Sequence, residues 1–268
     1  MNTNTVTHII YFIGLLLISP MLPLLYIQGK RVKKRTPRLS EARNPRGNST
    51  TAEESGKGLK MVVIGESTMA GVGVETHDEG FSGCLARELS GNWGLDVEWS
   101  VHARSGYTVQ QLTEEVLPEI HENGVDLIVV GVGANDAFAL NSTWKWKIHI
   151  TKMIKNVRLR YPTAAIVFSQ MPPIKEFSAF TPLMKFVMGN LVELYGRILE
   201  RITINLENVH YVNEVITINS WAEKFSLEAH KSEFFSDGVH PSRLTYETWA
   251  KDMAKQMALR SELKEVLL

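Results

Sequence analysis

Residues 62–68 have the sequence VVIGEST, an apolar run that ends at a glycine and is followed by a serine. If the run is a buried strand, Ser67 lies on a loop at the carboxyl edge of a sheet, where open α/β sheets bind their ligands. The same pattern is typical of a turn whose serine caps a helix, and these residues alone favour that second interpretation. Segments farther along the chain therefore decide between a functional site and a cap.

Apolar runs alternate with amphipathic segments from residue 60 onward. Strands that alternate with helices indicate a mainly parallel sheet covered by helices on both faces. With right-handed crossovers the result is a three-layer α/β/α sandwich, and a domain of about two hundred residues is large enough to bury its core. The expected strands are residues 60–64, 97–101, 127–132, 165–169 and 209–212, and the expected helices are residues 81–89, 109–121, 144–160, 183–206 and 245–257.

Glycines and polar residues also follow the second and third expected strands. Gly106 lies in ARSGYT, residues 103–108, where it is either a turn glycine or a residue whose backbone N–H points toward a substrate. Asn135 and Asp136 lie in GVGAND, residues 131–136. The Asn135 amide is a hydrogen-bond donor for a site at the strand end, although Asn and Asp also cap helices. Asp136 fits the capping interpretation, and we expect it to fix the loop.

A fourth segment, SDGVHPS at residues 236–242, holds an Asp three residues before a His. A bend at Gly238 would place the carboxylate of Asp237 beside the imidazole of His240. In such a pair the carboxylate fixes the tautomer of the His and stabilises the imidazolium as it forms. Alone, the segment is also typical of an Asp-Gly turn that leads into the last helix.

Together and in this order, the four segments resemble the SGNH (GDSL-type) hydrolase superfamily over residues 60–259. The resemblance implies a flavodoxin-like sandwich with a parallel five-stranded sheet. It implies that Ser67 is the nucleophile, that His240 is the base and that Asp237 orients this base. It also implies an oxyanion hole formed by Ser67, Gly106 and Asn135.

One residue departs from the family pattern, because Glu66 stands where the family usually has an Asp before the serine. Glu keeps the charge and lengthens the side chain by one methylene. We therefore expect a difference in the geometry of this loop and no change of nucleophile.

The expected activity is the hydrolysis of carboxylic esters through an acyl-enzyme, since a serine hydroxyl needs a base such as His240 to become a nucleophile. Small acyl esters, lysophospholipids and thioesters all stay open as substrates. An O-acetyl esterase acting on a sugar is the alternative within the same class. An inactive, membrane-anchored binding module is the alternative from another class, and the complete set of candidate residues argues against it.

Residues 9–27 carry no charged side chain, and about twenty apolar residues suffice to cross a bilayer as a helix. No Lys or Arg precedes this segment but several follow it, so the positive-inside rule predicts a cytoplasmic catalytic domain. A cleaved signal peptide and a peripheral amphipathic helix are the alternatives. We expect a membrane anchor at residues 1–28, a basic and then polar tether at 29–58 and the hydrolase domain at 59–268. The basic residues after the apolar segment are Lys30, Arg31, Lys33, Lys34, Arg35 and Arg38.

The charge balance and the single cysteine exclude several classes of protein. Lys and Arg together number 29, as do Asp and Glu, so the chain lacks the basic footprint of a nucleic-acid-binding protein. Cys84 alone forms neither an internal disulfide nor a cysteine-rich metal site. Without a Walker loop, a complete dinucleotide fingerprint or metal-ligand spacing, we expect no cofactor and no metal. The expected partners are an ester substrate, with lipid-derived esters among the candidates, and a membrane.

Overall fold

A six-stranded sheet forms the centre of the fold in the computed structural model, which describes residues 9, 11–14, 16, 18–51 and 58–268. Five neighbouring strands are parallel, and β1 pairs antiparallel with β3 at one edge. The strand order is β1-β3-β2-β4-β5-β6, so the parallel part has the flavodoxin-like order. The strands are β1 (Arg46–Ser49), β2 (Gly58–Gly65), β3 (Asp96–Ala103), β4 (Leu127–Gly131), β5 (Ala165–Phe168) and β6 (Val209–Tyr211).

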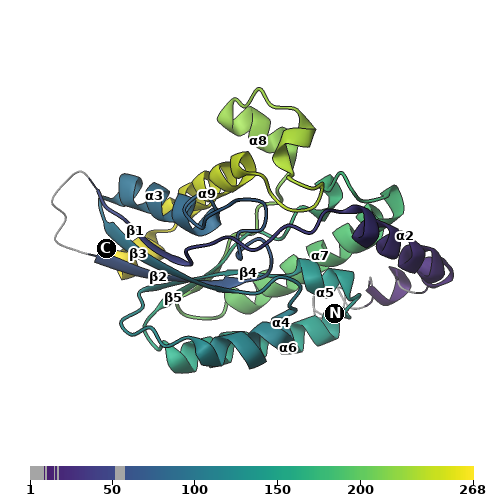
Figure 1. Cartoon of the computed structure of the whole chain (residues 1–268). Helices are drawn as coiled ribbons and strands as arrows, with labels where there is room; N and C mark the ends of the chain where they lie inside the picture. The colour runs from purple at the N-terminus through teal and green to yellow at the C-terminus, as the bar shows by residue number, and fades with distance from the viewer. Residues whose placement is uncertain (1–8, 10, 15, 17, 52–57) are drawn as a thin grey trace.

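Helices cover both faces of the sheet, which makes the expected three-layer α/β/α sandwich (Figure 1). The α3 and α9 helices pack together on one face, and α4, α6 and α7 lie on the other. The described helices of the domain are α3 (Phe81–Trp93), α4 (Val109–Gln111), α5 (Ala134–Phe138), α6 (Thr143–Arg160), α7 (Pro182–Thr203), α8 (Ile218–Phe225), α9 (Arg243–Ala258) and α10 (Ser261–Leu267). Short helical turns are η2 (Leu112–Val116), η3 (Leu117–Glu119), η4 (Ile174–Glu176) and η5 (Lys231–Phe234).

Continuous apolar runs explain the parallel strands. Every residue of β4 and of β5 is buried, as expected for strands that are covered on both faces. The five expected strands and four of the five expected helices are confirmed, with ends that differ by a few residues. Residues 109–119 form three short helical segments in succession and not one regular helix.

The sixth strand, β1, comes from the segment that we expected to be a tether. The sequence RGNS has no apolar residue to mark it as a strand, and its partner lies far along the chain. Gly47 packs directly on the indole ring of Trp99, whose side chain is buried beneath β1. The division of the chain into anchor, tether and hydrolase domain stays a prediction, but residues 46–49 contribute to the sheet.

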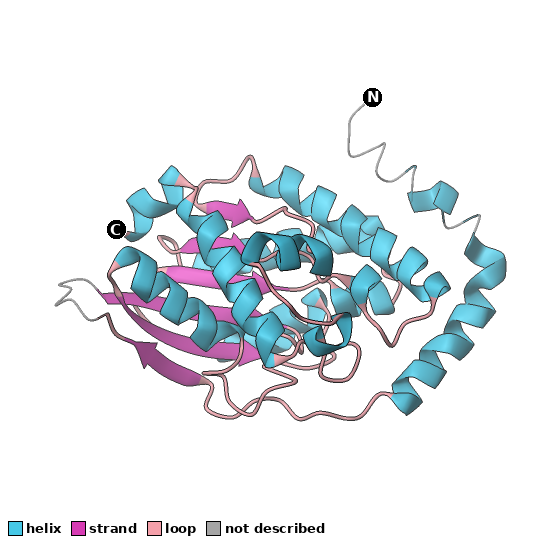
Figure 2. Ribbon diagram, turned by 90° about the horizontal axis from the view of Figure 1, so that it is seen from above, coloured by secondary structure: helices cyan, strands magenta, loops and turns pink. Residues whose placement is uncertain are grey.

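The amino-terminal segment forms η1 (Ser19–Met21) and α2 (Leu22–Arg35). Among the described residues, no helix has both the length and the apolar character needed to span a membrane. Residues 1–8, 10, 15 and 17 of the expected anchor lie outside the described part. The α2 helix packs against the domain, because Leu25 is buried and the Thr181 hydroxyl donates a hydrogen bond of 2.6 Å to Gln28. Seen from above, α2 lies at the end of the sheet opposite the C terminus, beyond the carboxyl ends of the parallel strands (Figure 2).

The three central strands end at the same level. Gly65 at the end of β2 is in register with Ala103 of β3 and with Gly131 of β4. The loops that carry three of the four sequence motifs therefore leave the sheet side by side at one edge.

Candidate active site

Asp237 and His240 form a hydrogen-bonded pair at this edge of the sheet. His240 Nδ1 lies 2.7 Å from one carboxylate oxygen of Asp237, and the backbone N–H groups of Val239 and His240 donate to the other oxygen at 2.9 and 2.8 Å. Burial raises the pKa of Asp237, but the hydrogen bonds from His240 and from the backbone outweigh this effect and hold the pKa below its usual value. An ionised Asp237 makes Nδ1 the donor, which leaves Nε2 of His240 free to accept a proton.

The bend between these two residues requires a glycine. Gly238 has a φ of +86°, which L side chains rarely adopt, and a Cβ there would lie 3.0 Å from Ala179. The N–H of Ala179 donates to the Gly238 carbonyl at 3.1 Å. The loop after β5 thereby fixes the turn that carries the Asp–His pair.

The Ser67 turn and the His240 loop are tied to each other. The hydroxyl of Ser236 lies 3.1 Å from the carbonyl oxygens of both Gly73 and Pro241. The structure thus brings the predicted serine and the predicted Asp–His pair to neighbouring loops. Within the part of the chain that the structure describes, the half-buried Ser67 hydroxyl makes no hydrogen bond, so it is not in hydrogen-bond contact with His240.

A further tie comes from the α9 helix. The buried hydroxyl of Tyr246, in α9, lies 3.1 Å from the carbonyl oxygen of Thr68 and 2.8 Å from that of Val72. The same helix begins directly after the His240 loop. Its packing therefore fixes the Ser67 turn and the His240 loop with respect to one common element.

Asn135 lies next to the loop that carries Gly106. The side-chain amide of Asn135 donates a hydrogen bond of 3.0 Å to the carbonyl of Tyr107. This bond uses one of its two N–H groups and leaves the second for a ligand. Gly106 is exposed with a φ of +85°, and a Cβ there would meet nothing within 4 Å. Its backbone is therefore accessible to a substrate from the open side of the loop.

Asp136 holds these loops together, as expected. Its buried carboxylate accepts a hydrogen bond from the backbone N–H of Val109 at 2.9 Å and from the side chain of Asn141 at 2.7 Å. Burial raises the pKa of Asp136, although both hydrogen bonds lower it. Asp136 thus connects the loops after β3 and β4, while its neighbour Asn135 faces Tyr107.

Glu66 has a structural role that the sequence did not suggest. Its buried carboxylate accepts hydrogen bonds from the backbone N–H groups of Gly133 at 2.7 Å and Asn135 at 3.0 Å. Burial raises the pKa of Glu66 to about 8, against the lowering effect of these two bonds. The residue next to the predicted nucleophile therefore fixes the backbone that carries the predicted Asn135 donor. The only signal in the sequence was an acidic residue immediately before Ser67.

A second missed residue belongs to the segment between α2 and β1. The Glu41 carboxylate accepts a hydrogen bond of 2.7 Å from the backbone N–H of Ser105, which precedes Gly106. The N–H of Ala42 donates to the carbonyl of Ala70 at 2.9 Å. This segment therefore runs past both the Gly106 loop and the Ser67 turn, although no sequence pattern linked it to either of them.

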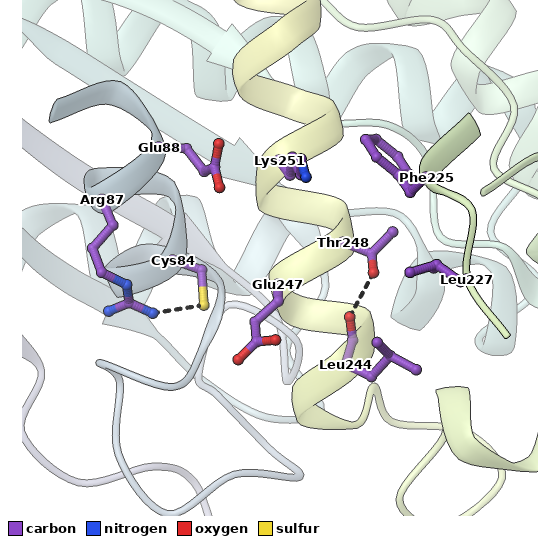
Figure 3. A pocket seen from close by; sticks show the side chains of 9 residues that line it. All are labelled: Cys84, Arg87, Glu88, Phe225, Leu227, Leu244, Glu247, Thr248 and Lys251. Carbon is purple, nitrogen blue, oxygen red and sulfur yellow. Dashed lines mark hydrogen bonds between the residues drawn. The ribbon is translucent and has the colours of Figure 1, made fainter. Parts of the chain in front are cut away.

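Among the residues that the structure describes, neither a metal site nor a reactive thiol lies beside these loops. The described residues include no group of three His, Cys, Asp or Glu side chains placed to hold a metal ion. A separate pocket between α3 and α9 is lined by Cys84 and Arg87, and by none of the predicted site residues (Figure 3). Burial raises the pKa of the Cys84 thiol to about 11, so the thiol is uncharged at neutral pH and a poor nucleophile.

The sandwich and the polar loops at its carboxyl edge are those of an α/β ester hydrolase. The model of the GDSL-like Lipase/Acylhydrolase family matches residues 63–248, and the chain belongs to this family. It is accordingly a hydrolase of the lipase/esterase type that acts on esters. The family resemblance drawn from the four sequence segments is confirmed, whereas the roles of the individual residues stay predictions.

Solved structures share the fold at low sequence identity. A family 3 carbohydrate esterase from Clostridium thermocellum has a TM-score of 0.58 and 16% identity, covering 79% of this chain and 100% of that one. The lipase Lip_vut3 from a goat rumen metagenome has a TM-score of 0.55 and 16% identity, and the match covers 74% of this chain and 97% of the lipase. The lipase/acylhydrolase from Enterococcus faecalis has a TM-score of 0.51 and 19% identity, and the match covers 74% of this chain and 95% of that enzyme. No curated protein matches the chain.

Proposed function

We propose that the chain is a serine esterase that cleaves carboxylic esters, lipid-derived esters among them, through an acyl-enzyme on Ser67. The observation that carries the proposal is the 2.7 Å contact between His240 Nδ1 and Asp237, on a loop tied to the Ser67 turn. It leaves the second imidazole nitrogen available as a base at the edge of the sheet where the serine lies.

The reaction runs in two halves. Ser67 Oγ attacks the ester carbonyl carbon while its proton passes to His240 Nε2. The tetrahedral intermediate collapses, the bond to the leaving oxygen breaks, and His240 returns the proton to that oxygen. Water then attacks the carbonyl carbon of the acyl-enzyme while its proton passes to His240. The bond from this carbon to Ser67 Oγ breaks, His240 returns the proton to Oγ, and the acid is released.

The oxyanion of each tetrahedral intermediate accepts hydrogen bonds from the backbone N–H groups of Ser67 and Gly106 and from the second N–H of Asn135. These donors are held before the reaction begins, since Glu66 fixes the backbone of Asn135. Preorganised donors of this kind contribute about 3 kcal/mol each to stabilisation of the transition state.

Hydrolysis of short p-nitrophenyl esters tests the proposal. We expect turnover by the wild type, a stable acyl adduct by intact mass in a rapid-quench experiment, and neither in Ser67→Ala. Ser232→Ala, which changes an exposed serine in η5, is the matched control and should keep both signals. A folded wild type without turnover would favour a binding module. A substrate panel that contains acetylated sugars and esters of longer acyl chains separates the O-acetyl esterase alternative from cleavage of longer acyl esters.

We also propose that the amino-terminal segment attaches the chain to a membrane and that the catalytic domain is cytoplasmic. Support comes from exposed apolar side chains in this segment, with Phe12 62%, Ile13 55% and Leu16 75% exposed. The basic residues of α2 follow this apolar part. A reporter fused to Leu268 should be accessible only from the cytoplasmic side, and labelling from outside would contradict the orientation.

A further inference from the structure

A pocket of about 420 Å³ lies between α2 and the turn that precedes α7. Arg31 and Arg35 line it from α2, Ala179 and Thr181 line it from the turn, and Asp237 closes it on the side of the His240 loop. The pocket thus adjoins the predicted catalytic pair without containing the imidazole.

The two arginines carry unneutralised charge toward this pocket. They lie four residues apart, on one face of α2, and both are exposed. Among the described residues, neither guanidinium has a hydrogen bond or an ion pair, and α2 itself contains no acidic residue. Four other arginines differ, because glutamate partners are present for Arg43, Arg46, Arg104 and Arg243.

The wall that carries these arginines is fixed to the domain. Leu25 is buried, and Gln28 accepts a hydrogen bond from the Thr181 hydroxyl. The same hydroxyl oxygen accepts the N–H of Met184 and so caps α7. A pocket with one rigid side and two free guanidinium groups is suited to a phosphate or carboxylate, which arginine binds through paired hydrogen bonds.

We propose that this pocket binds the anionic group of the ester substrate, and that Arg31 and Arg35 make the chain selective for esters that carry a phosphate or carboxylate near the scissile bond. The inference rests on the proposed esterase function, because it takes the reacting ester to lie beside His240. Asp237 also lines the pocket, and its negative charge is partly offset by the hydrogen bonds that the carboxylate accepts from His240 and the backbone.

Direct binding tests the pocket without depending on catalysis. Calorimetric titration of the full chain with glycerol phosphate should give binding, and titration with glycerol should give none. The double variant Arg31→Gln with Arg35→Gln should weaken the binding of glycerol phosphate at least roughly tenfold. The double variant Lys33→Gln with Lys34→Gln removes the same charge from the same helix, outside the pocket lining, and should bind as the wild type does. Absence of binding, or an equal loss in both double variants, would overturn the proposal.

Hydrolysis then tests the assignment to substrate. Hexanoylglycerol and hexanoylglycerol phosphate, both below their aggregation limits, differ only in the phosphate. We expect the wild type to have a higher kcat/KM for the phosphate ester, and the arginine double variant to lose this preference, so that its kcat/KM values for the two esters become equal. Ser67→Ala separates the two proposals: turnover that depends on Ser67 but shows no preference refutes the anion site alone. Titration with inorganic phosphate distinguishes a site for free anions. If inorganic phosphate binds as tightly as hexanoylglycerol phosphate, and the two esters have equal kcat/KM values, the pocket binds free anions and the proposal is refuted.

Discussion

The carboxylate of Glu66 accepts the backbone N–H of Asn135 at 3.0 Å, so the residue before the predicted nucleophile holds the backbone of a predicted oxyanion donor. Its other oxygen accepts the N–H of Gly133 at 2.7 Å. Two loops that leave neighbouring strands are in this way joined by one buried side chain. The spacing between the serine and the asparagine is therefore set inside the domain and not by the substrate.

Replacing Glu66 by Gln should lower both stability and turnover. Both oxygens of the Glu66 carboxyl group can accept a hydrogen bond, with or without a proton on the group, whereas the amide nitrogen of Gln cannot, so one of the two backbone N–H groups loses its partner in a buried place. At pH 5 we expect a loss of about 2 kcal/mol in the free energy of unfolding, and the variant should have a lower kcat with little change in KM. Glu66→Asp keeps both acceptors and restores the usual family residue, so it should retain more turnover than Glu66→Gln. The opposite order would contradict this role.

The wild type and Glu66→Gln should also differ in how their stability depends on pH. Burial raises the pKa of Glu66 in the folded state to about 8, from an ordinary value of 4.5. The folded protein then holds a proton that the unfolded chain releases, so this residue favours folding at low pH and less so as the pH rises toward 8. Urea unfolding at several pH values should show the stability advantage of the wild type over Glu66→Gln shrinking between pH 5 and 8. An advantage that grows over this range would mean that Glu66 is ionised when folded.

Replacing Asn135 by Ala should leave the fold intact and reduce kcat by roughly a hundredfold or more. The substitution removes the donor aimed at the oxyanion, together with the bond to the Tyr107 carbonyl. Asn141→Ala is the matched control, because its amide donates to Asp136 and not toward the predicted site. It should cost stability while sparing kcat. Unchanged turnover in Asn135→Ala would remove this residue from the site.

Replacing Asp237 by Asn should reduce kcat by roughly a thousandfold, because the amide no longer requires Nδ1 of His240 to carry the proton. The variant keeps the shape of the side chain, so circular dichroism and Tm should change little. Asp96→Asn is the control, since Asp96 accepts the N–H of Thr51 near the other end of β3. Steady-state hydrolysis of one short ester by all three proteins measures the effect. Equal kcat in Asp237→Asn and the wild type would show that the pair has no part in catalysis.

The parallel sheet and the loops that carry the candidate site could be predicted from the sequence, because both depend on local patterns. An apolar run such as residues 127–131 needs burial on two faces, and motifs at the ends of parallel strands meet at one edge. The family resemblance added the roles of Ser67 and His240, which alternation alone does not provide. Those roles are still predictions, whereas the proximity of the loops is a structural fact.

Features that depend on distant partners escaped prediction. Strand β1 is polar and is defined only by its pairing with β3, and α2 is defined by contacts such as Gln28 with Thr181. The apolar character of residues 9–27 suggested lipid as their environment, yet Leu25 is covered by the domain. A hydrophobic segment specifies burial without specifying what buries it.

Removing the amino-terminal part should therefore destabilise the hydrolase domain. A chain of residues 59–268, the domain as expected from sequence, lacks β1, and Trp99 loses the cover that Gly47 provides. Exposing much of a Trp side chain costs about 2 kcal/mol, and the uncovered β3 edge also becomes available for intermolecular pairing. We expect a Tm lower by roughly 5 °C and more aggregation than in a chain of residues 37–268, which keeps β1 and lacks α2. Equal Tm values in the two truncated chains would show that β1 adds nothing to the stability of the sheet.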